Sequence, residues 1–118
     1  MQLKRGRKGV GASAADKYIN LSVEFALDKP LRFGYNEYIP KNTVVNVKKV
    51  IAGAGSNEVL RAADRLSNNY GGNPLDWSKV VGTIDSLKYT FDIHWYYHNT
   101  IGSKEFKVKN YKERDDKK

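Results

Sequence analysis

Residues 87–98 carry the side chains with the clearest chemical potential in this sequence. One set of alternate positions is aliphatic or aromatic: Leu87, Tyr89, Phe91, Ile93, Trp95 and Tyr97. The positions between them are polar: Lys88, Thr90, Asp92, His94, Tyr96 and His98. Successive side chains of a strand point to opposite faces of a sheet. The alternation therefore predicts a strand with one packed face and one polar face that carries an imidazole.

Two further segments with a period of two flank this strand in the sequence. Residues 79–85 contribute Lys79, and residues 104–110 contribute Lys107 and Lys109. If the three segments form an antiparallel meander, their cations gather with His94 on one sheet face. An imidazole can take or give a proton near neutral pH, and ammonium groups stabilise charge on a phosphate.

These groups match the needs of metal-independent RNA cleavage, which are a base for the ribose 2′-hydroxyl, an acid for the leaving oxygen and cations for the phosphate. The candidate catalytic residues are His94, Lys107, Lys109, Tyr96 and Thr90. The last two can orient the phosphate or donate a proton. The candidate RNA contacts are Lys79, Arg61, Arg65, Asp92 and His98. The alternation alone also fits an ordinary solvated sheet face.

Other catalytic motifs are weak or incomplete. His94 and His98 have the spacing of a helical zinc motif, but Trp95 stands where its catalytic Glu belongs. On a strand the two imidazoles lie about 13 Å apart, too far to share an ion, so no metal site is predicted. Gly53-Ala54-Gly55 is assigned to a turn before a helix. Asp64, Asp85 and Asp92 are too scattered in the sequence to indicate a two-metal nuclease. Distant carboxylates can still meet in space, so a metal-dependent DNase is kept as an alternative.

Length and composition indicate one basic soluble domain. The 118 residues carry 21 Lys and Arg against 13 Asp and Glu, a formal charge of +8 that attracts polyanions. The chain has no Cys, and no apolar run approaches the roughly 18 residues that span a bilayer. Residues 1–12 are rich in Gly, Lys and Arg and are expected to be a flexible basic linker, with a single domain over 13–118.

The remaining elements are expected to support this sheet. A short helix is predicted over Ala12–Asn20, an irregular segment or edge strand over Leu31–Ile39, and a strand over Val44–Ile51. Ser56 or Asn57 is expected to cap a helix that ends at Gly71 and Gly72. Its apolar face comprises Val59, Ala62, Ala63, Leu66 and Tyr70, with Arg61 and Arg65 on the outer face.

Three parts of the sequence resemble a known family. These are the run Tyr70-Gly71-Gly72-Asn73-Pro74-Leu75-Asp76-Trp77-Ser78-Lys79-Val80-Val81-Gly82, the run Tyr89-Thr90-Phe91-Asp92-Ile93-His94-Trp95-Tyr96, and a closing Lys-x-Lys at Lys107 and Lys109. They resemble the C-terminal ribonuclease toxin domains of CdiA-type contact-dependent growth inhibition proteins, a class of bacterial polymorphic toxins. The resemblance covers roughly residues 44–110.

This resemblance implies the barnase, EndoU, colicin ribonuclease and RelE (BECR) group. The implied fold is α+β, with N-terminal helices packed on one face of a four- or five-stranded antiparallel sheet. Many members cleave tRNA without a metal or other cofactor. Their catalytic residues differ, and this chain has no second His beside His94 as in the EndoU pattern. The identities of the general base and acid therefore stay open.

The expected function is that of an antibacterial tRNA endonuclease acting by 2′-hydroxyl transesterification. The resemblance implies export as the C-terminus of a large surface protein and action in the cytoplasm of the target cell. It also implies a cognate immunity protein, expected to be acidic, that binds the monomeric toxin as a heterodimer. No membrane partner is expected. A noncatalytic RNA- or protein-binding module is the alternative from another class.

Overall fold

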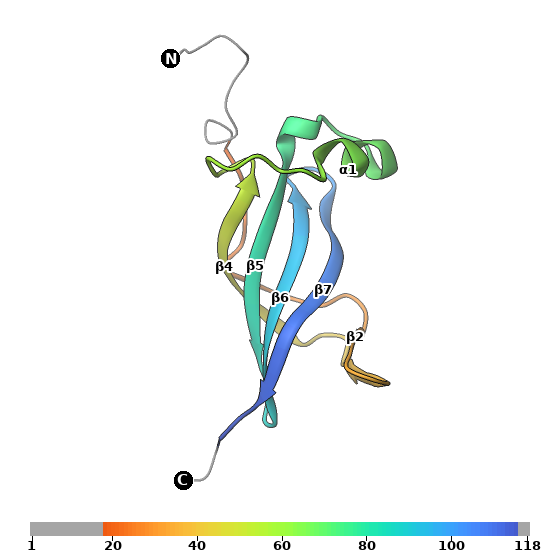
Figure 1. The fold of residues 1–118 in the computed structure, drawn as a ribbon, viewed down its shortest axis with the longest axis vertical. Coiled ribbons are helices and arrows are strands. Elements are labelled where there is room, and N and C mark those ends of the chain that lie inside the picture. Colours follow the sequence, from red (N-terminus) through yellow and green to blue (C-terminus); the bar gives the residue numbers. More distant parts are fainter. Residues whose placement is uncertain (1–17, 116–118) are drawn as a thin grey trace.

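The computed structural model describes residues 18–115, which form an α+β fold with a five-stranded antiparallel sheet and one short α-helix (Figure 1). The elements are β1 (Glu24–Ala26), β2 (Leu31–Phe33), β3 (Glu37–Ile39), β4 (Val44–Gly53), α1 (Ala63–Tyr70), the 3-10 turn η2 (Pro74–Asp76), β5 (Trp77–Asp85), β6 (Tyr89–His98) and β7 (Gly102–Glu113). The linker expected at 1–12 lies outside the described residues.

The strand order of the sheet is β1-β4-β5-β6-β7, and all neighbours are antiparallel. The predicted strand over 44–51 and the meander over residues 79–110 are confirmed. Residues 31–39 differ from the expected single segment, because β2 and β3 pair with each other around a turn at Gly34–Asn36. Gly34 and Asn36 have φ of 58° and 99°, which this tight turn requires.

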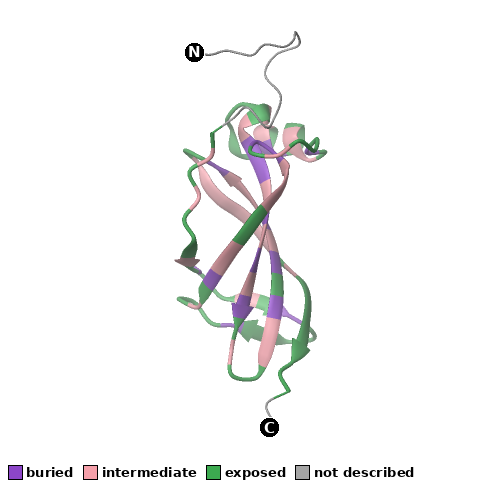
Figure 2. Cartoon of the chain, turned by 90° about the vertical axis from the view of Figure 1, so that its left-hand side faces the viewer, coloured by how far each residue is buried: buried purple, intermediate pink, exposed green. Residues whose placement is uncertain are grey.

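One face of the sheet, here called the packed face, carries the main core. Phe91, Ile93 and Trp95 of β6 are almost completely buried on it, as the alternation predicted. The chain from β1 to β3 crosses this face, and the Phe33 ring lies 4.7 Å from that of Phe91 (Figure 1). Figure 2 shows the resulting stripes of buried residues along the strands. The expected packing of Leu87 is wrong, because Leu87 lies in the β5–β6 turn and is 95% exposed.

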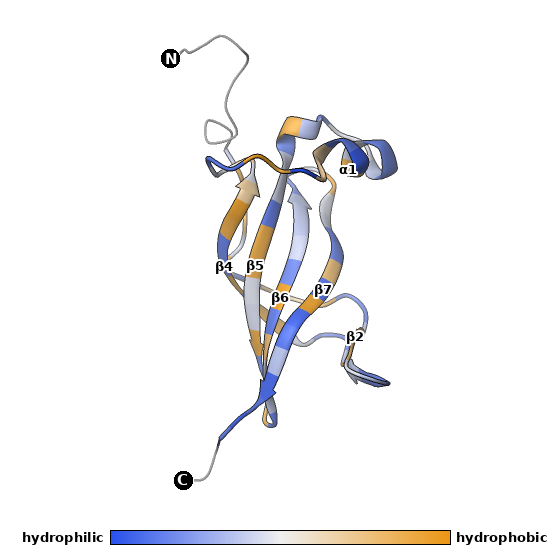
Figure 3. Cartoon of the chain, in the orientation of Figure 1, coloured by the Kyte–Doolittle hydropathy of each residue, from blue (hydrophilic) through white to orange (hydrophobic). Residues whose placement is uncertain are grey.

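The second face of the sheet, called the His94 face, is covered by α1 at one end. Trp77 of β5 pairs with His98, so its indole lies on the same side as the even-numbered residues of β6. The indole is buried against Leu60 and Leu66. Figure 3 shows hydrophilic and hydrophobic residues mixed along β5–β7, with a hydrophilic C-terminal end to β7.

The helix predictions are wrong in three respects. The helices are not N-terminal, because α1 lies between β4 and β5, and it is the only α-helix within 18–115. Residues 18–20, the described part of the helix expected at Ala12–Asn20, are not helical. The helix expected from Ser56 or Asn57 begins only at Ala63. The Ser56 hydroxyl instead donates to the Gly53 carbonyl and accepts from the Glu58 N–H, which closes a turn. Val59 is consequently 83% exposed.

We predict that Gly82→Ala destabilises the fold. Gly82 lies on the packed face, where an added Cβ would meet the Asn46 carbonyl oxygen and stand 2.9 Å from the Trp95 ring. Overpacking of this kind costs about 1–3 kcal/mol, to be measured by urea denaturation. Leu87→Ala, at an exposed turn position, should change stability by less than about 0.5 kcal/mol. Equal stability of the two variants would contradict this packing.

Candidate active site

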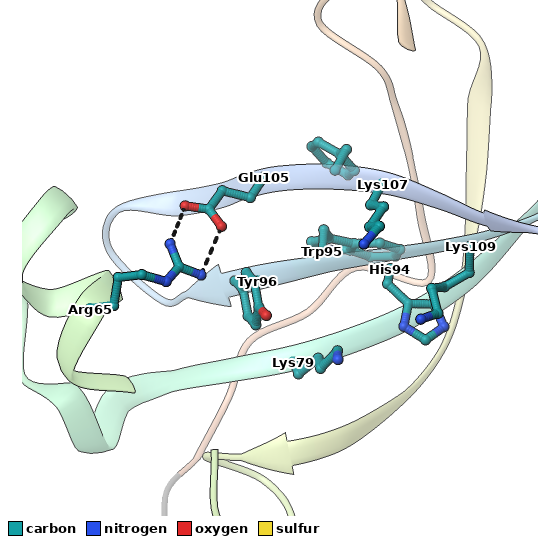
Figure 4. Close-up of a pocket in the computed structure, with 9 residues that line it drawn as sticks. Arg65, Lys79, His94, Trp95, Tyr96, Glu105, Lys107 and Lys109 are labelled. Carbon is teal, nitrogen blue, oxygen red and sulfur yellow. Dashed lines mark hydrogen bonds and ion pairs between the residues drawn. The ribbon is translucent and has the colours of Figure 1, made fainter. Parts of the chain in front are cut away.

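A cleft of about 410 Å³ opens on the His94 face beside α1 (Figure 4). Its lining combines cations, aromatic rings and one carboxylate: Arg65, Lys79, His94, Trp95, Tyr96, Glu105, Phe106, Lys107 and Lys109. The cleft therefore contains six of the ten residues that the sequence singled out. The helix covers one end of the face, and the strands leave the centre of the face open.

Strand pairing brings the central residues of the cleft together. His94 lies opposite Lys107 of β7, and Tyr96 lies opposite Lys79 of β5. Direct partners on neighbouring antiparallel strands share a face. The ammonium groups of Lys79, Lys107 and Lys109 extend toward the imidazole of His94 (Figure 4).

Bulges in β7 adjust which of its side chains reach this cleft. The pairing shifts once between Asp92 and Ile93 of β6 and again between His94 and Tyr96. The first shift leaves Lys109 as an extra residue, and the second leaves two residues, Glu105 and Phe106, across from Trp95. Glu105 has φ of 58°, a left-handed conformation that side-chain-bearing residues rarely adopt. The bulges place Lys109 and Glu105 on the rim of the cleft together with Lys107.

The surroundings of His94 disfavour its protonated form. Partial burial lowers the pKa of the imidazole, and the charges of Lys79, Lys109 and Lys107 lower it further against the opposing effect of Asp92. The Nδ1 atom is buried and has no hydrogen-bond partner among residues 18–115. Nε2 is thus the nitrogen left to face the cleft. A neutral imidazole at this position can accept a proton at physiological pH.

Arg65 is fixed at the end of the cleft by Glu105. Its guanidinium donates two hydrogen bonds, of 2.9 and 3.1 Å, to the two carboxylate oxygens, and the Tyr70 hydroxyl donates a third at 2.8 Å. The bond from Arg65 lowers the pKa of the Glu105 carboxyl, and the bond to Glu105 raises the pKa of Tyr70. The guanidinium also lies 5.9 Å from the centre of the Tyr96 ring.

Glu105 is the site residue that sequence reasoning missed. It occupies an odd-numbered position of the strand predicted over residues 104–110, like Lys107 and Lys109, but no role followed from that position. Its partner Arg65 is 40 positions away in the sequence, so the pairing depends on where α1 lies. A carboxylate among clustered lysines was the available signal.

The three lysines of the cleft have no anionic partner within the described part of the chain, where the salt bridge of the cleft joins Arg65 to Glu105. The lining carries four cations and one carboxylate. Like charges held together repel one another, so an anion that enters the cleft gains electrostatic free energy from several of them.

Four of the singled-out residues do not line this cleft. Arg61 is exposed just before α1, and Asp92 is exposed on β6 between Thr83 and Asn110. Thr90 lies four residues from His94, about 13 Å along the strand, and lines a separate cleft with Asp85 and Lys112. Thr90 therefore cannot reach a phosphate that His94 contacts.

His98, the fourth, is buried rather than exposed, so its predicted place on the polar surface is wrong. Its ring is 6% exposed and lies 5.2 Å from that of Trp77, below the loop that follows α1. Nδ1 accepts hydrogen bonds from the backbone N–H groups of Thr100 and Ile101, at 3.1 and 3.3 Å. His98 thus fixes the β6–β7 turn, away from the cleft.

No group of three or more His, Asp or Glu side chains suited to hold a metal ion occurs within residues 18–115. The helices described in this range are also too short and polar to cross a membrane.

Comparisons of the chain with protein-family models, with curated proteins and with solved structures gave no match.

Proposed function

We propose that this domain is an endoribonuclease that cleaves RNA at the His94 cleft without a metal, by transesterification through the ribose 2′-hydroxyl. The observation that carries the proposal is a neutral, partly buried imidazole surrounded by three lysines without anionic partners in the described chain. Such a site can deprotonate a hydroxyl and bind a phosphodiester at once.

In this mechanism Nε2 of His94 accepts the proton of the 2′-hydroxyl. The 2′-oxygen attacks phosphorus, a 2′,3′-cyclic phosphate forms, and the bond to the 5′-oxygen of the next nucleotide breaks. The Tyr96 hydroxyl supplies a proton to that leaving oxygen. His94 and Tyr96 stand on the same face two residues apart, about 7 Å along β6, so they can act on opposite sides of one phosphate.

The cations of the cleft bind the phosphate and stabilise its extra charge in the transition state. Lys79 and Lys107 flank the imidazole from the two neighbouring strands, and Lys109 joins them through the bulge. Arg65 keeps three further N–H donors beyond the two bound by Glu105 and contributes a contact at the end of the cleft. Arg61 can extend the RNA contact surface from the start of α1.

The biological setting follows from the family resemblance. The proposed role is that of a BECR-type toxin domain, exported at the end of a large surface protein and cleaving tRNA in the cytoplasm of a target cell. The +8 charge of the chain favours an acidic immunity protein that occludes the cleft in a one-to-one complex. A noncatalytic RNA-binding module would use the same lysines but would not need the neutral imidazole.

We predict that His94→Ala lowers the rate of RNA cleavage by about 10²–10⁴-fold, because the proton acceptor is lost. RNA binding should persist. Cleavage by the unsubstituted protein should continue in EDTA and leave 2′,3′-cyclic phosphate ends. Lys41→Ala, which removes an exposed cation from the turn before β4, serves as the control and should cleave normally.

Three results would contradict the assignment. Full activity of His94→Ala removes the imidazole from the mechanism. RNA binding without cleavage by the unsubstituted protein supports the binding module. Cleavage of duplex DNA that stops in EDTA supports a metal-dependent DNase.

A second prediction concerns pH. Because the pKa of His94 is lowered, the acid limb of kcat/KM should have its midpoint below the ordinary value of 6.5. Lys79→Met removes a cation that disfavours the imidazolium, so it should move this midpoint to higher pH. Lys41→Met should not move it. A midpoint at or above pH 6.5, or one that Lys79→Met leaves unchanged, would show that His94 is not the group whose titration produces the acid limb.

A further inference from the structure

The two bulges of β7 place lysines from several positions on the His94 face. Lys104, Lys107 and Lys112 lie opposite Tyr96, His94 and Thr90, which are even-numbered residues of the regularly paired β6. In an unbroken strand Lys107 would face away from both other lysines, because it lies three positions from Lys104 and five from Lys112, and odd offsets point to opposite faces. Each bulge adds one residue and reverses the alternation. All three side chains consequently begin on the face that carries the cleft, and Lys104 lines a neighbouring groove with Tyr70 and Asp28.

These lysines, together with Lys109, form what we call the β7 track. It extends along β6 from Tyr96 to Thr90, six residues or about 20 Å. No lysine of the track has an anionic partner among the described residues. The Lys104 ammonium lies 5.4 Å from the centre of the Tyr70 ring, in a cation–π contact.

Carboxylates on the same face are fewer. Glu105 is bound to Arg65 and Tyr70, and Asp92 lies opposite Asn110. Asp85 faces Thr90 at the far end. There Thr90 and Lys112 line a second open cleft of about 500 Å³, with Asp85, Glu113, Arg114 and Asp115. The track therefore runs from the His94 cleft, where cations outnumber carboxylates, into another surface depression, whose lining carries three carboxylates and two cations.

We infer, on the basis of the proposed function, that the substrate is an extended RNA strand whose backbone lies along the β7 track. Lys104 and Lys112 bind phosphates on either side of the phosphate that is cut at His94. Polar residues lie between the lysines on this face, whereas the centre of a protein interface is usually apolar. A single row of cations suits a polynucleotide backbone better than a protein partner. Thr90 then contacts RNA beside Lys112 and takes no part in proton transfer.

The test measures binding of a single-stranded 2′-O-methyl RNA of about twelve nucleotides, which cannot undergo transesterification and is longer than the track. Fluorescence anisotropy across a salt series gives the affinity and its salt dependence for the unsubstituted protein, Lys104→Gln, Lys112→Gln and the double variant. Lys41→Gln is the matched control, because it removes the same charge from an exposed turn outside the track.

Each substitution in the track should weaken binding about threefold, the usual scale of one exposed ionic contact. It should also reduce the slope of log K against log salt by about 0.7, and the double variant by about 1.4. Lys41→Gln should change neither quantity. Lys112 is exposed and Lys104 is half-buried at the edge of the sheet, so circular dichroism of each variant should match that of the unsubstituted protein.

The outcomes separate this inference from the catalytic proposal. If Lys104→Gln and Lys112→Gln leave the slope unchanged, the track is overturned even when the protein cleaves RNA. If the slope falls as expected but no RNA is cleaved, the track stands and the catalytic proposal fails. Weaker binding of an acidic protein with unchanged binding of RNA would also overturn the track.

Discussion

Pairing of β6 on both sides is the constraint on which the rest of the structure depends. β5 matches β6 residue for residue from Trp77 to Asp85, so the side chains of β6 must alternate strictly between the two faces. Because Phe91, Ile93 and Trp95 are buried on one face, His94 and Tyr96 must lie on the opposite face. Fully burying such side chains is worth about 1.5–3 kcal/mol each, so a slip of one residue, which would expose all three, is strongly disfavoured.

The His94 face serves two purposes because α1 covers only one end of it. Leu66 and Trp77 form a small second core there, and the central part of the face stays open for the cleft. The bidentate pair of Arg65 and Glu105 joins the helix to β7 across the border between these regions. Clustering of three lysines beside His94 opposes folding through mutual repulsion. Partial burial lowers the pKa of the imidazole, and the charges of the same lysines lower it further. The lysine charges thus carry a structural cost and contribute to the proposed chemistry.

The sequence predicted the strands well because their alternation is local information, and residues 79–85 and 89–97 confirm it. It placed Lys79, His94, Tyr96 and Lys107 on one face for the same reason. The predictions from sequence were wrong where contacts between residues distant in the sequence determine the local structure. Ser56 closes a turn instead of capping a helix, and His98 is buried because the loop after α1 folds over it. The bulges of β7 depend on pairing with β6, so no single-strand pattern shows that Lys104 and Lys112 share the face of His94.

The central claim is that the His94 imidazole is neutral in the free protein and that RNA binds with a phosphodiester next to it. NMR titration of the His94 ring tests both parts directly. In the free protein the ring should titrate below pH 6.5. Binding of non-cleavable RNA should raise its pKa, because a phosphate next to the imidazole stabilises the protonated form and offsets the neighbouring lysines. Titration at or above 6.5 in the free protein, or a pKa that bound RNA leaves unchanged, would contradict the account.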